Sequence, residues 1–374
     1  MTTQTFEEAE IKSFGNRIMD LVRGKHLTRE EARQMYTEVL LEKQPDLQQG
    51  AFMMILSAKG ETAEEIAGSY DAIYELDTVK VHPVTPGPLV DNCGTGMDEL
   101  KTCNISTAAS IIAAADGVYM AKHGARAVTS TCGAVDILEA LGVDVECDPD
   151  VVRHSIEKAG IGIFNGMSPK VHPQALGRIL SQIRFGTTLN ISGSLANPVM
   201  PAYGVRGVYA ASLTETVAEV MHRIGYSRAM VFHGLNADGS KGMDEISTLG
   251  QTRISELDES GGIRTYEISP EDMGITLARE EDIMPDGSIE DEVLHFLRVL
   301  SGKDQGPRYD IICLNTAPIL YLTGKVSSLK DGVVRAREII KSGTPIAKLR
   351  QWVWEQNTAP DQGAARLESL LAQI

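Results

Sequence analysis

The sequence predicts an α/β protein with a helical N-terminal domain over residues 1–80 and a large α/β domain, with a mainly parallel central sheet, over residues 81–374. Apolar side chains in the first 80 residues recur at helical spacing. A stretch rich in proline and glycine at 83–88 then breaks this pattern. From about residue 88 onward, short apolar runs alternate with helical patterns, which is typical of parallel strands joined by helices.

The helices of the N-terminal domain are indicated by apolar spacing and by start signals. The first helix has apolar residues at helical intervals, namely Ile11, Phe14, Ile18 and Leu21. Thr28 with Glu31, and Thr62 with Glu65, have capping-box spacing, which satisfies free backbone donors at a helix start. Between the two boxes a buried helix is marked by Phe52, Met53, Ile55 and Leu56.

In the α/β domain, short apolar runs predict strands and longer periodic segments predict helices. The expected strands are Pro88–Val90, Val118–Met120, Gly162–Phe164, Ala229–Phe232 and Ile311–Leu314. The expected helices cover roughly 105–115, 135–141, 213–224, 289–300 and 327–341. Because ligands of such domains bind at the carboxyl ends of the strands, the loops that follow the strands are the places to look for chemistry.

Composition and charge exclude several classes of protein. The 374 residues are 43% hydrophobic and 23% charged, which is typical of a globular protein. The N-terminus lacks the features of a signal peptide, and apolar runs fall short of the roughly 18–20 residues of a membrane helix, so we expect a cytoplasmic protein. A net charge of −16 argues against nonspecific nucleic-acid binding. The five cysteines form no CxxC pair and therefore indicate neither a disulfide framework nor a zinc site.

A glycine-rich loop follows the first expected strand, with the sequence Gly94-Thr95-Gly96-Met97-Asp98. Glycines let backbone N–H groups approach phosphate oxygens, and the next helix would present its positive end to them. Asp98 would repel a phosphate unless it holds a metal ion, its water or a ribose hydroxyl. Further neutral donors follow at Thr102, Asn104, Ser106 and Thr107. A plain turn is the alternative interpretation of this loop taken alone.

A second loop follows the strand near residue 120 and combines basic, glycine and hydroxyl residues. Lys122 would give a point charge and Arg126 a bidentate fork for a phosphate. His123 is a candidate general acid or base, or a packing histidine. The further candidates in this loop are Gly124, Ser130 and Gly133. An exposed basic loop is the alternative.

The adjacent carboxylates of Asp244 and Glu245 are the candidate metal ligands. Mg²⁺ prefers carboxylates, water and substrate phosphates as ligands. Two neighbouring carboxylates repel each other in a pocket unless such a cation balances their charge. Solvated surface charges are the alternative. Taken by themselves, His172 and Pro173 indicate only a turn.

Taken in order, these segments resemble the anthranilate phosphoribosyltransferase family of tryptophan biosynthesis. The motifs are GTGMD with TCNISTAA, KHGAR with CGAVDILEALG, LNISGSLANP, MDEIS and LNTAPILYLTG, and the resemblance covers essentially residues 10–355. It implies a helical domain that is discontinuous in sequence, with a later helical segment near 172–200, and a homodimer formed through that domain. It also implies that the enzyme transfers 5-phosphoribose from phosphoribosyl pyrophosphate (PRPP) to an aromatic amine or heterocycle and releases pyrophosphate, with Mg²⁺ as cofactor.

The resemblance assigns roles position by position. The residues that match the family's donor and first-magnesium positions are Gly94, Thr95, Gly96, Asp98, Asn104, Ser106, Thr107 and Lys122. The pair Asp244 and Glu245 matches the acidic magnesium ligands, and Ser106 would complete the metal site. The acceptor channel is matched by His123, Gly124, Arg126, His172 and Pro173.

Departures from the family pattern fall beside the acceptor. Met97 stands where the family has glycine, Ala125 where it has asparagine, and Val171 where it usually has an aromatic residue. The arginine that would pair with the anthranilate carboxylate has two candidates, Arg178 and Arg184. Anthranilate itself and another aromatic or heterocyclic acceptor therefore both stay open.

Two other functions are compatible with the same scaffold. A nucleoside phosphorylase typically carries a DKHSTGG-like phosphate loop, and residues 91–96 lack its lysine, histidine and serine. A non-enzymatic relative that binds nucleic acid is disfavoured by the net charge and by the retained acidic pair.

Overall fold

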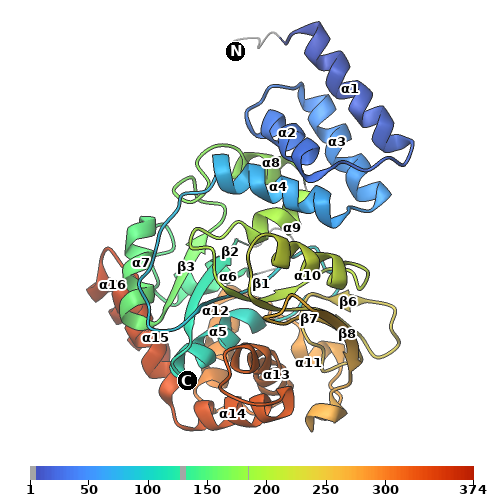
Figure 1. Ribbon diagram of the computed structural model, residues 1–374. Helices are drawn as coiled ribbons and strands as arrows, with labels where there is room; N and C mark the ends of the chain where they lie inside the picture. Colours follow the sequence, from blue (N-terminus) through green and yellow to red (C-terminus); the bar gives the residue numbers. More distant parts are fainter. Residues whose placement is uncertain (1–5, 127–131, 184) are drawn as a thin grey trace. The chain divides into compact units, whose positions relative to one another are not determined.

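The computed structural model describes residues 6–126, 132–183 and 185–374 (Figure 1). It divides into two compact units. The first comprises Met1–Val79 with Met167–Pro198, and the second comprises Lys80–Gly166 with Val199–Ile374. No helix within the described ranges is long and apolar enough to cross a membrane.

The first unit is helical, which confirms the predicted N-terminal helical domain. Its helices are α1 (Glu8–Val22), α2 (Arg29–Leu40), α3 (Asp46–Lys59), α4 (Ala63–Leu76), α8 (Leu176–Gln182) and α9 (Thr188–Leu195). Both capping boxes form, at the starts of α2 and α4. The rings of Phe14, Tyr36 and Phe52 pack together, with centroids 5.0 to 5.5 Å apart. The unit is therefore held by capped helices around an aromatic core.

The second unit is built on one sheet with the order β3-β2-β1-β4-β5-β7-β8, in which β6 also pairs with β5. The strands are β1 (Leu89–Gly94), β2 (Tyr119–Gly124), β3 (Ile161–Asn165), β4 (Tyr203–Gly207), β5 (Arg228–Leu235), β6 (Gly242–Met243), β7 (Thr252–Leu257) and β8 (Ile263–Ile268). The first five strands pair with one another in parallel, whereas the pairs β5–β6, β5–β7 and β7–β8 are antiparallel. The predicted mainly parallel sheet is confirmed.

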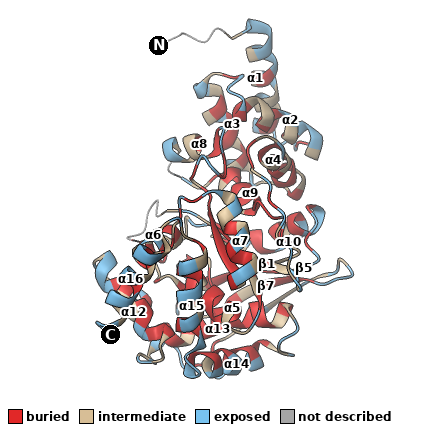
Figure 2. Cartoon of the chain, turned by 90° about the vertical axis from the view of Figure 1, so that its left-hand side faces the viewer, coloured by how far each residue is buried: buried red, intermediate tan, exposed pale blue. Residues whose placement is uncertain are grey.

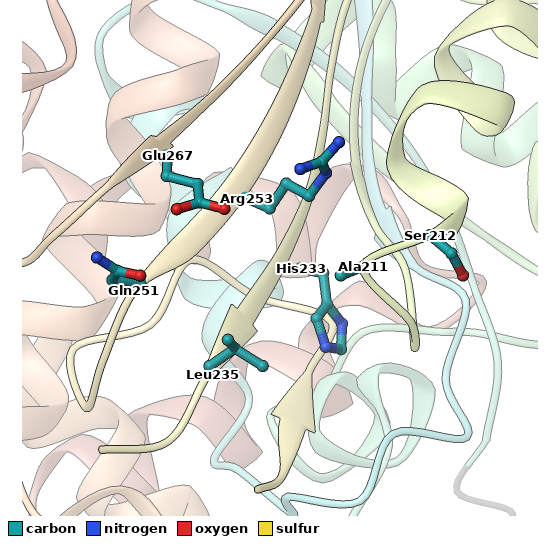
Figure 3. Close-up of a pocket in the computed structure, with 7 residues that line it drawn as sticks. All are labelled: Ala211, Ser212, His233, Leu235, Gln251, Arg253 and Glu267. Carbon is teal, nitrogen blue, oxygen red and sulfur yellow. The ribbon is translucent and has the colours of Figure 1, made fainter. Parts of the chain in front are cut away.

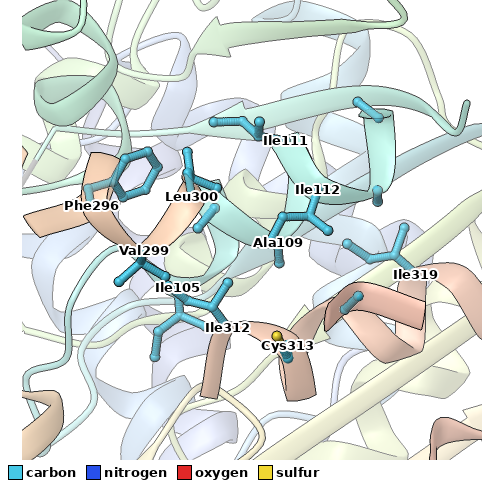
Figure 4. Packing of buried hydrophobic residues seen from close by; sticks show 14 of the residues in the cluster. Ile105, Ala109, Ile111, Ile112, Phe296, Val299, Leu300, Ile312, Cys313 and Ile319 are labelled. Atoms are coloured by element: carbon cyan, nitrogen blue, oxygen red, sulfur yellow. The ribbon is translucent and has the colours of Figure 1, made fainter. Parts of the chain in front are cut away.

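Helices cover this sheet and bury its core. They are α5 (Ile105–Ala115), α6 (Ala134–Ala140), α7 (Pro149–Ala159), α10 (Leu213–Arg223), α11 (Glu280–Ile283), α12 (Ile289–Leu300), α13 (Pro307–Leu322), α14 (Leu329–Lys341), α15 (Thr344–Glu355) and α16 (Pro360–Leu371), with a 3₁₀ turn at Glu271–Met273. Side chains of α5, α12 and α13 interlock in one apolar cluster (Figure 4). Figure 2 shows the central strands and α5 largely buried, whereas α16 exposes much of its surface.

One predicted strand was wrong. Ile311–Leu314 lies inside helix α13, and all four side chains are buried. A helix that is enclosed on every side is apolar on every side, so it lacks the amphipathic period that separates helices from strands in a sequence. The short apolar run therefore resembled a buried strand.

Candidate active site

The glycine-rich loop follows β1 and is tied to two other segments through its backbone. The N–H of Thr95 donates to the carbonyl oxygen of Gly207 at 3.0 Å, at the end of β4. The N–H of Gly96 donates to Oδ2 of Asp244 at 2.8 Å. The structure thus brings together the loop and the acidic pair, which are almost 150 residues apart in sequence.

Two glycines allow Asp244 to approach the strand ends. A Cβ atom at Gly94 would lie 2.1 Å from Oδ2 of Asp244, and a Cβ atom at Gly207 would lie 1.6 Å from its carbonyl oxygen. A side chain at Gly94 would displace the carboxylate of Asp244, and one at Gly207 would displace its backbone. The position of Asp244 therefore depends on glycine in both β1 and β4.

The start of helix α5 lies beside the acidic pair and carries three of the predicted donor residues. Asn104 occupies the N-cap position, and its side-chain amide donates to the carbonyl of Cys132 at 3.3 Å. The backbone N–H of Ser106 hydrogen-bonds to Glu245. The hydroxyl of Thr107 is buried, and no described residue hydrogen-bonds to it. An unsatisfied hydroxyl at a helix start is suited to an anionic ligand that the structure does not contain.

Three carboxylates crowd this region, and burial makes their charge costly. Burial, and then the neighbouring charge of Asp244, raise the pKa of Asp98 to about 7. Burial also raises the pKa of Asp244, and burial together with the charge of Asp244 raises the pKa of Glu245 well above its ordinary value. Within the described ranges, no three His, Cys, Asp or Glu side chains are grouped closely enough to form a metal site by themselves. A cation here would need oxygens of a substrate or of water to complete its shell.

Lys122 lies in the interior, at the carboxyl end of β2. Its side chain is 1% exposed, and Nζ donates to the carbonyl of Asn92 at 2.6 Å. Burial lowers its pKa, although the negative charge of Glu245 is among the groups that oppose this shift. The ammonium group is therefore held beside β1 and faces the field of the acidic pair.

Sequence reasoning missed a buried ion pair that supports the next residue, His123. Arg206 donates from Nη2 to Oδ2 of Asp91 at 2.8 Å, and Oδ1 of Asp91 accepts the backbone N–H of His123 at 3.1 Å. The imidazole of His123 is 4% exposed and leaves no room for a side chain at Gly166. An arginine inside the apolar strand of residues 203–207 was the signal that could have revealed the pair.

Arg126 is engaged by carboxylates. Its guanidinium pairs with Asp136 at 3.2 Å, Glu139 at 2.7 Å and Glu146 at 3.0 Å. It would have to leave these partners in order to bind a phosphate or an acceptor.

The remaining residues of this region divide into described and undescribed positions. Gly124 accepts the N–H of Gly166 through its carbonyl, and Gly133 forms the N-cap of α6. Thr102 lines a small cavity of about 160 Å³ beside the loop, together with Lys101. Ser130 lies outside the described residues.

His172 and Pro173 belong to the helical unit, as do Val171 and Arg178. Nδ1 of His172 lies 2.6 Å from the carbonyl oxygen of Asp77, so the ring is held by the end of α4. Arg178 forms an ion pair with Glu42 at 2.9 Å. Arg184 is outside the described residues.

Comparison with known proteins gives the same family over both units. Residues 86–346 match the glycosyl transferase family a/b domain, and residues 15–76 match the helical bundle domain of that family. The anthranilate phosphoribosyltransferase of Desulfosudis oleivorans is 38% identical over 342 residues, which is 91% of this chain and 98% of that protein. The one from Acetivibrio thermocellus is 40% identical over 90% of this chain and 94% of its own length.

Solved structures agree with these relatives. The anthranilate phosphoribosyltransferase of Thermus thermophilus superposes with a TM-score of 0.79 at 32% identity, over 91% of this chain and 98% of that one. The enzyme from Saccharomyces cerevisiae in complex with PRPP and Mg has a TM-score of 0.78 at 25% identity, over 93% of this chain and 98% of that one. The chain therefore belongs to the anthranilate phosphoribosyltransferase family of glycosyl transferases.

Proposed function

We propose that this enzyme transfers 5-phosphoribose from PRPP to anthranilate, or to a closely related aromatic amine, in tryptophan biosynthesis, and releases pyrophosphate. The hydrogen bond from the Gly96 N–H to Asp244 supports this function most directly, because it joins the glycine-rich loop to a buried acidic pair. The yeast relative, solved with PRPP and Mg, and the named bacterial relatives support the same donor and acceptor.

Donor binding uses backbone amides and hydroxyls more than cations. The positive end of α5 suits phosphate oxygens, and Gly94, Thr95 and Gly96 are the proposed loop contacts. The amides of Thr95 and Gly96 would exchange their bonds to Gly207 and Asp244 for bonds to the donor. We assign the unsatisfied hydroxyl of Thr107 to the same ligand. Other proposed donor contacts are Thr102, Asn104, Ser106 and Lys122, with Asp98 toward a ribose hydroxyl or metal-bound water.

The carboxylates fit a divalent cation. Burial raises the pKa values of Asp244 and Glu245, and a bound cation would balance the negative charge of the two carboxylates. We propose Asp244, Glu245 and Ser106 as the residues that hold Mg²⁺ when the donor is present. A bound Mg²⁺ would supply positive charge against the leaving pyrophosphate.

The transfer itself is a displacement at C1 of the ribose. The amine nitrogen forms a bond to C1 while the bond from C1 to the pyrophosphate oxygen breaks, and its electron pair leaves with pyrophosphate. Charge therefore develops on pyrophosphate, where Lys122 and the loop amides are proposed to stabilise it, a contribution of about 3 kcal/mol per donor in comparable sites. The amine nitrogen then loses its proton, and we propose His123 as the acceptor of that proton.

Acceptor binding is assigned to a different set of side chains. Those proposed are Gly124, Arg126, Ser130, Gly133, His172 and Pro173. Met97 and Ala125 alter the family pattern in this set, so anthranilate and related amines need to be compared directly.

Pyrophosphate release tests this function. PRPP and Mg²⁺ are supplied with anthranilate, its ring isomers, and nicotinate-like acids, and each reaction is repeated with a chelator. We expect release with anthranilate that disappears when Mg²⁺ is chelated. Release of pyrophosphate with another acceptor but not with anthranilate would identify that acceptor as the substrate. No release with any acceptor would contradict the proposal.

We also propose a cytoplasmic homodimer that forms through the helical unit. Large apolar side chains are exposed on that unit: Met19, Val22, Leu41, Leu47 and Met54. We assign these side chains to the dimer interface, where association would remove their apolar surface from water. Sedimentation equilibrium should give the mass of a dimer for the native chain and of a monomer for Leu47→Lys, and a native monomer would contradict the assignment.

A further inference from the structure

A cavity of about 310 Å³ lies in the α/β unit, on β5, β7 and β8 beside the start of α10 (Figure 3). It is lined by Ala211, Ser212, His233, Leu235, Gln251, Arg253 and Glu267. None of these residues belongs to the glycine-rich loop or to the acidic pair. Its volume is within the range of sites that hold small molecules.

Three titratable side chains stand in a row across this cavity. His233 is the cross-strand partner of Arg253, and Arg253 is the partner of Glu267. Residues in direct register point to the same face of a sheet. The sheet therefore presents an imidazole, a guanidinium and a carboxylate side by side.

The guanidinium and the carboxylate do not neutralise each other. Within the part of the chain that the structure describes, neither Arg253 nor Glu267 forms an ion pair or a side-chain hydrogen bond, although opposite charges in direct register normally interact. Arg253 is half-buried and Glu267 is exposed. In Figure 3 the guanidinium end of Arg253 is turned away from Glu267. Each charge is thus available to a ligand.

His233 forms a buried wall of the same space. It is 5% exposed, and its Nδ1 lies 2.8 Å from the carbonyl oxygen of Val208. A carbonyl only accepts, so Nδ1 donates the proton of this bond. A Cβ atom at Gly242 would lie 2.2 Å from Cε1 and Nε2 of the ring, so this edge of the imidazole packs against Gly242 and is held in place.

Apolar and hydroxyl groups complete the lining. Leu235 and Ala211 supply apolar surface, and Ser212 occupies the N-cap position of α10 without making a side-chain cap bond. A carboxylate placed beside Ser212 would also lie at the positive end of that helix.

We propose that this cavity binds a small zwitterion of the free α-amino acid class. Its carboxylate pairs with Arg253 near Ser212, its ammonium group pairs with Glu267, and its side chain packs against Leu235. A simple anion would meet the unbalanced charge of Glu267, and a simple cation would meet that of Arg253. Only a ligand with both charges satisfies both side chains.

Binding is tested on the whole enzyme, without reference to catalysis. Each of the protein α-amino acids is screened by thermal shift, and those that raise Tm are measured by calorimetry. N-acetyl and methyl-ester forms of the best binder lack one charge each and should bind at least about tenfold more weakly, a difference of about 1.4 kcal/mol.

Matched variants locate the site. Arg253→Met and Glu267→Gln should each reduce affinity at least about tenfold, while Arg264→Met, on the opposite face of β8, should leave it unchanged. Glu267 is exposed, so its variant is expected to fold even where Arg253→Met does not, and circular dichroism checks both. Absence of binding by every amino acid, equal binding of the one-charge derivatives, or binding that survives Glu267→Gln would overturn the proposal.

Discussion

Arg206 and Asp91 form an ion pair of 2.8 Å in which neither side chain has any exposed surface. The pair joins β4 to β1, and the second oxygen of Asp91 accepts the N–H of His123 on β2. Three adjacent strands are therefore connected by one carboxylate at the ends that carry the proposed active site. Nε and Nη1 of Arg206 are buried without a hydrogen-bond partner among the described residues.

Arg206→Met should destabilise the protein strongly, because it leaves the charge of Asp91 buried and unpaired. Loss of one partner from a buried pair costs about 3–5 kcal/mol in comparable cases. Urea unfolding measures the change. The double variant Arg206→Met with Asp91→Asn should recover much of the loss, and a double variant as unstable as the single one would contradict this account. Arg350→Met, which breaks the exposed pair with Glu368, serves as the control.

Gly207→Ala should reduce both stability and turnover, since the new methyl group would overlap the backbone of Asp244. Overpacking of a close-packed site costs typically about 1–3 kcal/mol. Thermal unfolding and pyrophosphate release measure the two effects. Gly50→Ala is the matched control, because it lies in helix α3 with open space around it and should be neutral or slightly stabilising. Equal behaviour of the two variants would refute the steric requirement.

The raised pKa of Asp98 predicts a pH dependence of stability in the free enzyme. Its folded-state pKa of about 7 lies above the ordinary value of 3.8, so the folded protein holds this proton more tightly than the unfolded chain does. Its contribution to stability is therefore full below about pH 4 and is lost as the pH rises toward 7. Asp98→Asn should flatten the decline of the unfolding free energy across this range, as measured by urea unfolding. A decline as steep as that of the native enzyme would count against the shift.

Met97 has a φ angle of +67°, in the left-handed region that favours glycine. A non-glycine residue there costs roughly 1–2 kcal/mol, so Met97→Gly should raise Tm. If Met97 and Ala125 also reshape the acceptor pocket, Met97→Gly with Ala125→Asn should increase kcat/KM for anthranilate. A raised Tm with unchanged kcat/KM would support backbone strain at Met97 but would contradict a role of Met97 and Ala125 in acceptor binding.

Local signals made the helical domain and the parallel sheet predictable. Thr28 and Thr62 cap their helices through contacts with residues three positions further on, so the helix starts could be predicted from local sequence. The loop at Gly94 and the residue Lys122 lie at the carboxyl ends of adjacent parallel strands, which is why strand prediction was enough to expect them in one region.

Long-range packing explains what the sequence did not reveal. The apolar run at 311–314 was read as a strand because its helix is buried all round. The inward direction of Lys122 depends on the carbonyl of Asn92. The partners of Arg126 depend on how α6 packs, and Arg206 acquires its role only from Asp91, on another strand.

We propose that Asp244 and Glu245 hold the magnesium on which donor binding and transfer depend. Calorimetric titration of PRPP, with and without Mg²⁺, into the native enzyme and into Asp244→Asn with Glu245→Gln tests it most directly. We expect Mg²⁺-dependent binding of PRPP by the native enzyme. In the folded double variant, that dependence should be lost together with pyrophosphate release. A double variant that binds PRPP with undiminished dependence on Mg²⁺ would contradict the account.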